Sequence, residues 1–162
     1  TTGINYAELH GRMHLKIADI LKTAGIVDMS PEGMVETKVT FNVLPHGLGH
    51  LLGLQVHDVA GFQLSQEGGI KPAPDKYPAL RLTREITEGQ VFTIEPGLYF
   101  IPMLLKKLKQ SVYHTAVNWP LIEELMPFGG IRIEDNIAVQ NGSPVNLTRR
   151  AFSAAKAEAR SM

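Results

Sequence analysis

One short stretch constrains this chain more than any other. It reads HGLGHLLGLQVHD and carries His46, His50 and His57, three of the six histidines of the chain. Glycines separate the histidines, and glycine lets a backbone turn tightly and approach another backbone closely. Neutral imidazole is the commonest metal ligand and a common general base near pH 7. A glycine-rich turn with incidental histidines would explain any one of them, but three together, with the carboxylates described below, favour a metal or catalytic site.

The composition narrows the kind of site. The chain has no cysteine, which excludes a thiolate ligand, a thiolate nucleophile and a disulfide framework. Sixteen basic and sixteen acidic residues give a net charge of +0, so bulk charge attracts neither nucleic acid nor an anionic membrane. The sequence has no signal-peptide pattern and no apolar run of about 20 residues. We therefore expect one globular domain of a cytoplasmic enzyme, with any metal held by oxygen and imidazole nitrogen.

Hydrophobic periodicity predicts the order of the elements. Apolar residues recur at every fourth position from Leu9 to Leu21, which predicts an amphipathic helix over 5–24 with His10 and His14 partly exposed on its flank. Polar, glycine-rich or proline-rich composition predicts loops at 28–37 and 60–77 and a basic turn at 106–110. The expected strands are 39–43, 80–83, 91–95, 98–105 and 131–139, and the expected helices are 119–125 and a terminal helix capped by Thr148.

Strand alternation places two carboxylates and an arginine. Glu95 ends the strand 91–95 on the face away from its most apolar residues, and Arg132 and Glu134 share one face of the strand 131–139. Such a charged row is most simply a solvent-exposed face, but the preceding glycine pair and the apolar character of the other strands favour a cleft. His50, Glu95 and Glu134 form a set that Mn²⁺, Co²⁺ or Zn²⁺ accepts. The histidines lack the HExxH pattern of a zincin helix.

Four motifs extend this set: PHGLGH at 45–50, QVHDVAG at 55–61, TIEPGLY at 93–99 and PFGGIRIEDN at 127–136. Their order and spacing resemble the bacterial Xaa-Pro dipeptidases (prolidases), to which the organophosphorus acid anhydrolases are closely related. The resemblance runs from about Tyr6 to Arg149. It implies an α+β fold of the pita-bread type, in which helices flank a curved antiparallel sheet, here incomplete at its N-terminus.

The resemblance also implies a mechanism and a set of roles. Two divalent metal ions, with Mn²⁺ expected and Co²⁺ or Zn²⁺ as alternatives, are held by two aspartates, one histidine and two glutamates. The metal ligands that it implies in this chain are His50, Glu95 and Glu134, with Glu134 bridging the ions. The residues that it places against the substrate and the reacting atoms are Glu95, His57, His46 and Arg132. The implied reaction is hydrolysis of an Xaa-Pro dipeptide by a metal-bridged hydroxide, in a homodimer.

Two aspartate ligands have no counterpart here, because the family carries them on a hairpin upstream of the first helix. The acidic residues that precede His50 fall in the predicted helix or the polar connector: Glu8, Asp19, Asp28, Glu32 and Glu36. We therefore expect residues 1–162 to be the C-terminal portion of a catalytic domain, without the N-terminal domain and the aspartate hairpin, and to be inactive alone. Two alternatives stay open: phosphotriester hydrolysis at the same site, and a metal-free pita-bread enzyme or binding module.

Overall fold

The computed structural model describes residues 2–161, which form two compact units built from interleaved segments. The first unit contains the start of the chain up to Leu9, then 47–95 and the chain from Ile133 onward; the second contains 10–46 and 96–132. The long helix α1 (Tyr6–Thr23) begins in the first unit and continues in the second. Within the described residues, no helix is both long and apolar enough to cross a lipid bilayer.

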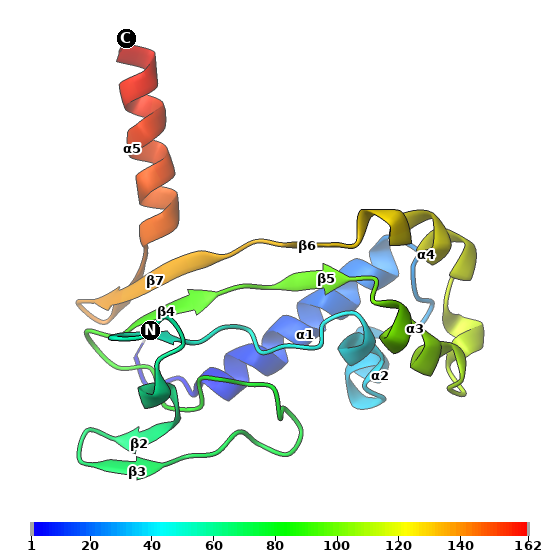
Figure 1. The fold of residues 1–162 in the computed structure, drawn as a ribbon, viewed down its shortest axis with the longest axis horizontal. Coiled ribbons are helices and arrows are strands. Elements are labelled where there is room, and N and C mark those ends of the chain that lie inside the picture. Colours follow the sequence, from blue (N-terminus) through cyan, green and yellow to red (C-terminus); the bar gives the residue numbers. More distant parts are fainter. Residues whose placement is uncertain (1, 162) are drawn as a thin grey trace. The chain divides into compact units, whose positions relative to one another are not determined.

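A four-stranded antiparallel sheet organises the first unit, in the strand order β1-β4-β7-β8. Its two central strands, β4 and β7, are labelled in Figure 1. Its strands are β1 (Leu51–Leu52), β4 (Val91–Ile94), β7 (Asp135–Gln140) and β8 (Ser143–Asn146). Ile94 pairs with Asp135 at one end of the β4–β7 ladder. Because the strands are antiparallel, Glu95, which follows Ile94, and Glu134, which precedes Asp135, leave the sheet at the same place.

One face of this sheet is apolar. It lines a cavity of about 350 Å³ whose walls are Ile4, Leu9, Ile86, Phe92, Ile94, Ile137, Val139 and Pro144. Thr93 lies between Phe92 and Ile94 in β4, so its side chain points to the other face. The two faces therefore divide as strand alternation predicts, with the apolar side chains on one side and the threonine and the carboxylate of Glu95 on the other.

The segment expected as a loop at 60–77 contains regular structure. The 3₁₀ turn η2 (Val59–Phe62) leads into a hairpin of β2 (Gln63–Ser65) and β3 (Gly68–Ile70). Gly68 and Gly69 have φ of 113° and 81°, a region that favours glycine, and they make the tight turn possible. The strand expected at 80–83 is wrong, because this segment joins no ladder; Thr83 instead donates its backbone N–H to the carbonyl of Gly61 at 2.9 Å.

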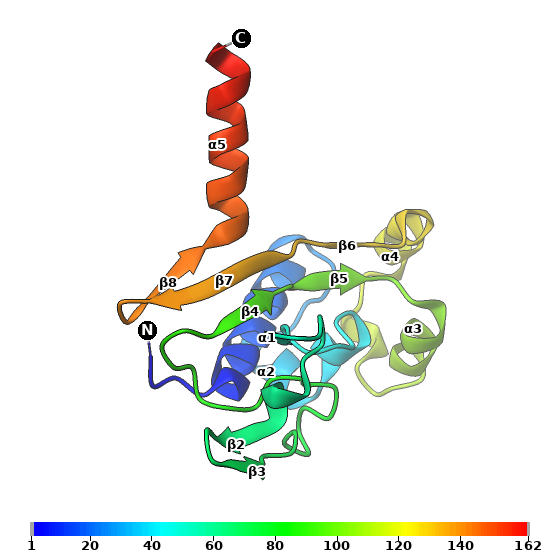
Figure 2. The ribbon, with the colours of Figure 1, turned by 60° about the vertical axis from the view of Figure 1, so that its left-hand side comes forward.

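The first unit ends in the helix α5 (Leu147–Ser161), which follows β8 directly and projects away from the sheet (Figure 2). The expected cap at Thr148 is wrong. Asn146 caps the helix, since its Oδ1 accepts from the backbone N–H of Arg149 at 2.8 Å. The hydroxyl of Thr148 accepts instead from the backbone N–H of Asn136 at 2.9 Å, which ties the first turn of α5 to β7.

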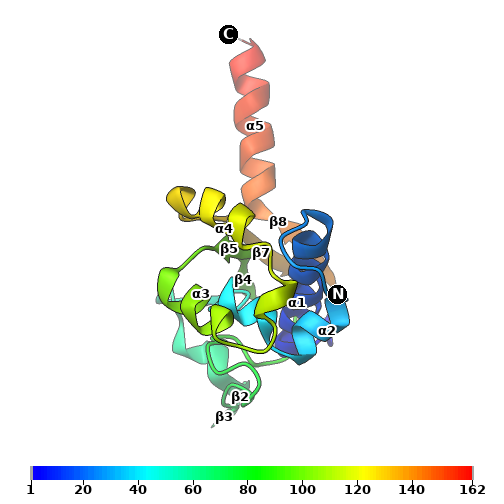
Figure 3. The same cartoon turned by 90° about the vertical axis from the view of Figure 1, so that its right-hand side faces the viewer.

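The second unit is mainly helical (Figure 3). Besides α1 its helices are α2 (Pro31–Glu36), α3 (Pro102–Lys109) and α4 (Trp119–Leu125), with the 3₁₀ turns η1 (Val39–Asn42), η3 (His114–Ala116) and η4 (Met126–Phe128). A short antiparallel pair, β5 (Gly97–Tyr99) and β6 (Gly130–Arg132), completes it. The sequence predictions of α1 and α4 are confirmed, and Asn118 caps α4 by accepting from the N–H of Leu121 at 3.3 Å.

Four predictions in the second unit are wrong for local reasons. Residues 28–37 contain α2, which Ser30 caps by accepting from the N–H of Gly33 at 3.1 Å. The expected strand at 39–43 is the 3₁₀ turn η1, because Lys38 takes a left-handed φ of 60° and turns the chain into contact with α2 and α3. The expected strand at 98–105 stops at Tyr99, and the expected turn at 106–110 lies mostly in α3, since proline suits the first turn of a helix.

The strand expected over 131–139 is split. Its first part, β6, ends at Arg132 and pairs with β5, whereas its second part, β7, begins at Asp135 and pairs with β4. The break falls at Ile133 and Glu134. The alternation that placed Arg132 and Glu134 on one face therefore does not run through this segment.

His10 and His14 are buried, with exposed fractions of 2% and 1%, so their expected position on an exposed flank is wrong. The Nδ1 atom of His14 lies 2.9 Å from Oγ1 of Thr40, and its ring stacks on Phe41 with centroids 4.2 Å apart. Burial lowers the pKa of His10 to about 3, with further lowering by His14 and His46. Thr40 and Phe41 of η1 cover His14, and the ring of His14 lies edge to face on that of His10 with centroids 4.6 Å apart, which the periodicity of α1 alone cannot show.

Acid should destabilise the fold through His10. The pKa of His10 is about 3 in the fold and 6.5 when unperturbed, so the unfolded chain binds the proton first. The part of the free energy of unfolding that depends on a neutral His10 is fully present above pH 6.5 and is lost as the pH falls toward 3. At pH 5 the free energy of unfolding is lower by about 2 kcal/mol. Urea unfolding at pH 7.5 and 5.0 measures this loss. His10→Gln should reduce the pH dependence, whereas the exposed control His114→Gln should keep it; an unchanged slope in His10→Gln would contradict the assignment.

Candidate metal centre

Three side chains from three segments of the first unit converge. His50 precedes β1, Glu95 follows β4 and Glu134 precedes β7, and each offers one ligand atom within 4.8 Å of the others. Backbone pairing sets this arrangement: the N–H of Glu95 donates to the carbonyl of Leu48 at 2.7 Å, and the N–H of Thr93 donates to that of His50 at 3.0 Å. His50 and Glu95 are buried, while Glu134 is exposed.

The hydrogen bonds of His50 indicate which ring nitrogen is available. Its Nδ1 lies 3.2 Å from the carbonyl oxygen of Leu51, and since a carbonyl only accepts, Nδ1 carries the proton. Nε2, which carries the lone pair of the neutral ring, lies 3.5 Å from Oε1 of Glu95. Two electron-rich atoms held this close are stabilised by a cation between them. An imidazole fixed by a backbone carbonyl, together with carboxylates, is an arrangement typical of divalent metal sites.

His57 and Arg81 adjoin this group, and no sequence pattern pointed to the arginine. The rings of His50 and His57 lie 4.2 Å apart at 74°, edge to face. Nη1 of Arg81 lies 3.2 Å from Nδ1 of His57. A guanidinium has only donors, so Nδ1 of His57 accepts and the proton of its neutral ring is on Nε2. Arg81 was missed because it stands between two buried leucines in a segment that we expected to be an ordinary strand.

His46 and Arg132 belong to the second unit. Nε2 of His46 lies 2.8 Å from the hydroxyl of Tyr99 in β5, with the rings edge to face at 5.2 Å. Arg132 is exposed at the end of β6, opposite Gly97. Because the strand is split after Arg132, strand alternation no longer places Arg132 on one face with Glu134. The substrate-binding role that the resemblance implies for Arg132 stays a prediction.

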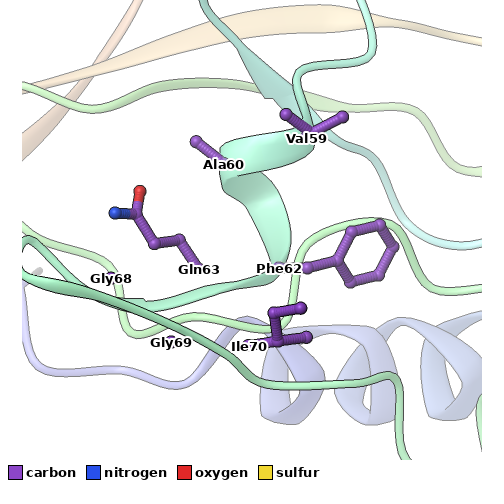
Figure 4. A pocket seen from close by; sticks show the side chains of 7 residues that line it. All are labelled: Val59, Ala60, Phe62, Gln63, Gly68, Gly69 and Ile70. Atoms are coloured by element: carbon purple, nitrogen blue, oxygen red, sulfur yellow. The ribbon is translucent and has the colours of Figure 1, made fainter.

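A separate apolar cavity lies between η2 and the β2–β3 hairpin (Figure 4). Its volume is about 550 Å³, and its lining consists of Val59, Ala60, Phe62, Gln63, Gly68, Gly69 and Ile70. His50, Glu95 and Glu134 are not part of this lining. The convergence of ligand atoms, rather than this cavity, is therefore the feature of the first unit that suggests chemistry.

A comparison with protein families shows to which family the chain belongs. The profile of metallopeptidase family M24 matches residues 2–141. This chain belongs to metallopeptidase family M24. Membership implies divalent metals, and it agrees with the imidazole and carboxylate atoms that converge in the first unit.

Curated M24 relatives include Xaa-Pro dipeptidases. That of Xanthomonas campestris pv. campestris strain B100 is 50% identical over 152 residues, which cover 94% of this chain and 34% of the relative. That of Stenotrophomonas maltophilia strain K279a is 50% identical over 153 residues, with the same shares of 94% and 34%. The resemblance seen in the four motifs is thus confirmed. The chain spans about a third of the length of these relatives.

Solved M24 structures confirm the pita-bread fold. The low-pH form of E. coli aminopeptidase P superimposes with a TM-score of 0.61 at 27% identity, covering 91% of this chain and 26% of that one. The zinc-substituted E. coli enzyme in complex with product gives a TM-score of 0.58 at 26% identity with the same coverage. This chain therefore corresponds to part of that fold.

Proposed function

We propose that residues 1–162 form the C-terminal portion of a catalytic domain that hydrolyses Xaa-Pro dipeptides with divalent metal ions. The observation that carries the proposal is the convergence of His50, Glu95 and Glu134, with Nε2 of His50 turned toward a carboxylate. The names of the relatives that are 50% identical support the substrate class. We propose Mn²⁺ as the metal, with Co²⁺ or Zn²⁺ as alternatives, two ions in the intact site, and a cytoplasmic homodimer.

The residues of this chain fit distinct tasks. Bound divalent ions supply positive charge that polarises a carbonyl and acidifies water. His57, whose Nε2 carries the proton, can donate to the oxygen that becomes negative in the transition state. Glu95 is buried and its carboxylate is held by Thr93 at 3.2 Å, which suits a group that moves a proton to the departing nitrogen.

A dipeptide also presents a free carboxylate, which calls for a cation. The resemblance assigns this task to Arg132 and His46. The structure adds Arg81, whose guanidinium lies beside His57 in the unit that holds the converging ligands. Arginine binds a carboxylate with two parallel hydrogen bonds, so we propose Arg81 as a further cation for the dipeptide carboxylate.

Replacing Arg81 by lysine should raise KM for an Xaa-Pro dipeptide by about 10-fold or more in the full-length protein, with a smaller change in kcat. Lysine keeps the charge but loses the planar fork. Steady-state kinetics on the dipeptide and on its C-terminal amide measure the effect, and the amide should not distinguish the variants. Arg132→Lys tests in the same way whether Arg132 binds the dipeptide carboxylate. Arg150→Lys, on α5, is the control. Equal kinetics for Arg81→Lys and the control would remove Arg81 from the site.

The proposed function is tested by metal content and turnover of the full-length protein. About two transition-metal ions per chain, with hydrolysis of Ala-Pro after Mn²⁺ loading, are expected. Hydrolysis of a phosphotriester without hydrolysis of Ala-Pro would redirect the proposal to an organophosphorus acid anhydrolase, and absence of bound metal would favour a metal-free module.

Residues 1–162 alone, which supply three of the implied five ligands, should hold at most one ion loosely and show no turnover until the missing segment is added in trans.

A further inference from the structure

The hydroxyl of Thr93 links two of the converging residues. Thr93 lies in β4 and is 1% exposed. Its Oγ1 accepts from the backbone N–H of His50 at 3.0 Å and lies 3.2 Å from Oε1 of Glu95. An amide N–H only donates, so the single hydroxyl proton is free to point at the carboxylate. One side chain therefore joins the backbone that carries the imidazole to the carboxylate that faces it.

Tyr6 fixes the Thr93 peptide through a different atom. The buried hydroxyl of Tyr6 donates to the carbonyl oxygen of Thr93 at 2.6 Å, across 87 residues of sequence. Its ring packs edge to face on Phe92 with centroids 5.5 Å apart. Burial, and next the charge of Glu95, raise the pKa of Tyr6, which keeps the phenol protonated and donating at ordinary pH. The first turn of α1 thus holds the β4 backbone at the position of Thr93.

Gly49 lets the histidine segment lie directly on this pair. A Cβ atom at Gly49 would lie 2.5 Å from the Tyr6 hydroxyl and 2.6 Å from Oγ1 of Thr93, closer than real Cβ atoms approach. The backbone beside His50 therefore contacts Tyr6 and Thr93 without an intervening side chain. This close approach explains why the N–H and the carbonyl of His50 both reach Thr93 at 3.0 Å.

We infer that Thr93 is a positioning residue of the candidate metal centre, whose hydroxyl holds the Glu95 carboxylate toward Nε2 of His50 while Tyr6 anchors its peptide. The inference rests on the proposed metal-binding role of His50 and Glu95. A glutamate side chain that is not held must give up rotamer freedom when it binds a metal. Hydrogen bonds that orient ligands from outside the coordination sphere typically change metal affinity by about 10–100-fold.

The experiment is a Co²⁺ titration of the full-length protein, followed by the visible absorption of the bound ion. Thr93→Val, which keeps the side-chain shape and removes the hydroxyl, should weaken Co²⁺ binding by about 10–100-fold and change the visible band. Thr93→Ser should restore both to near the unchanged chain. The matched control is Thr40→Val, which removes another fully buried threonine hydroxyl, 2.9 Å from Nδ1 of His14 in the second unit. Thr40→Val should lower the unfolding temperature without changing the Co²⁺ titration.

Each other outcome overturns the inference in a recognisable way. Equal Co²⁺ affinity and spectrum in Thr93→Val and the unchanged chain would show that the hydroxyl does not position the carboxylate. Equal weakening in Thr40→Val would show a general effect of lost stability. If Thr93→Val does not fold, Tyr6→Phe replaces it, and an unchanged Co²⁺ titration in Tyr6→Phe would remove the anchoring role. No binding of Co²⁺ by the unchanged full-length protein would refute the proposed metal centre itself, which separates that failure from failure of the Thr93 inference.

Discussion

Replacing His50 by alanine in the full-length protein should lower kcat/KM on an Xaa-Pro dipeptide by at least about 100-fold and should reduce bound metal in the same preparation. Nε2, which carries the lone pair of the neutral ring, lies 3.5 Å from Oε1 of Glu95, so the ring is in position to complete a donor set with the two carboxylates. Losing a direct ligand should exceed the 10–100-fold cost typical of more distant partners. The fold should survive, because the backbone atoms of His50 that bond to Thr93 are unchanged.

The matched control is His114→Ala, which removes an exposed histidine from η3 in the second unit. This variant should keep both the metal content and the turnover of the unchanged protein. Metal content measured by elemental analysis and far-UV circular dichroism separate a lost ligand from a lost fold. Near-normal turnover in His50→Ala would exclude His50 from the metal shell, whatever its geometry.

The residues that converge could be predicted from sequence because their signals are local. The spacing of histidines and glycines marks the segment that carries His46, His50 and His57, and the Pro96 that follows Glu95 marks a strand end where a side chain is free to face a site. The pairing of β4 with β7 then brings Glu134 to Glu95, as expected for carboxylates on adjacent strands. Their roles as metal ligands stay predictions until the metal is measured.

The residues that support His50, Glu95 and Glu134 could not be predicted, because the positions of these supporting residues depend on distant segments. Thr93 reads only as a good strand former, and its hydrogen bonds exist because residues 48–50 extend the pairing beside β4. Arg81 gains significance only from the ring of His57. His14 contacts η1, whose sequence resembles a strand until the left-handed Lys38 turns it, and His10 packs against His14.

The split of the segment 131–139 shows the same limit. Its alternating pattern suits a strand, and both halves are indeed strands, but they pair with different partners. Ile133 and Glu134 lie at the change from one pairing to the other. Periodicity detects extended backbone and not the partner, so it could not show that one half of the segment pairs with β4 and the other half with β5.

Replacing Gly49 by alanine should lower the free energy of unfolding by about 3 kcal/mol or more, a loss comparable to severe overpacking of a core. The added methyl group would meet the backbone carbonyl of Thr93, the hydroxyl of Tyr6 and Oγ1 of Thr93. The first of these is backbone within the β4–β7 ladder, so it cannot move aside as a flexible side chain would. Relief requires the His50 segment to lift away from β4.

Urea unfolding of three alanine variants measures this effect against graded controls. Gly25→Ala places a methyl in open space at a φ of 67°, so it should cost only about 1 kcal/mol of backbone strain. Gly47→Ala, whose nearest neighbour would lie at 3.0 Å, should fall between the two. A cost for Gly49→Ala no larger than that of Gly25→Ala would mean that the histidine segment does not rest on Tyr6 and Thr93. The expected order follows because a contact with fixed backbone cannot be relieved without breaking the hydrogen bonds that align His50 with Glu95.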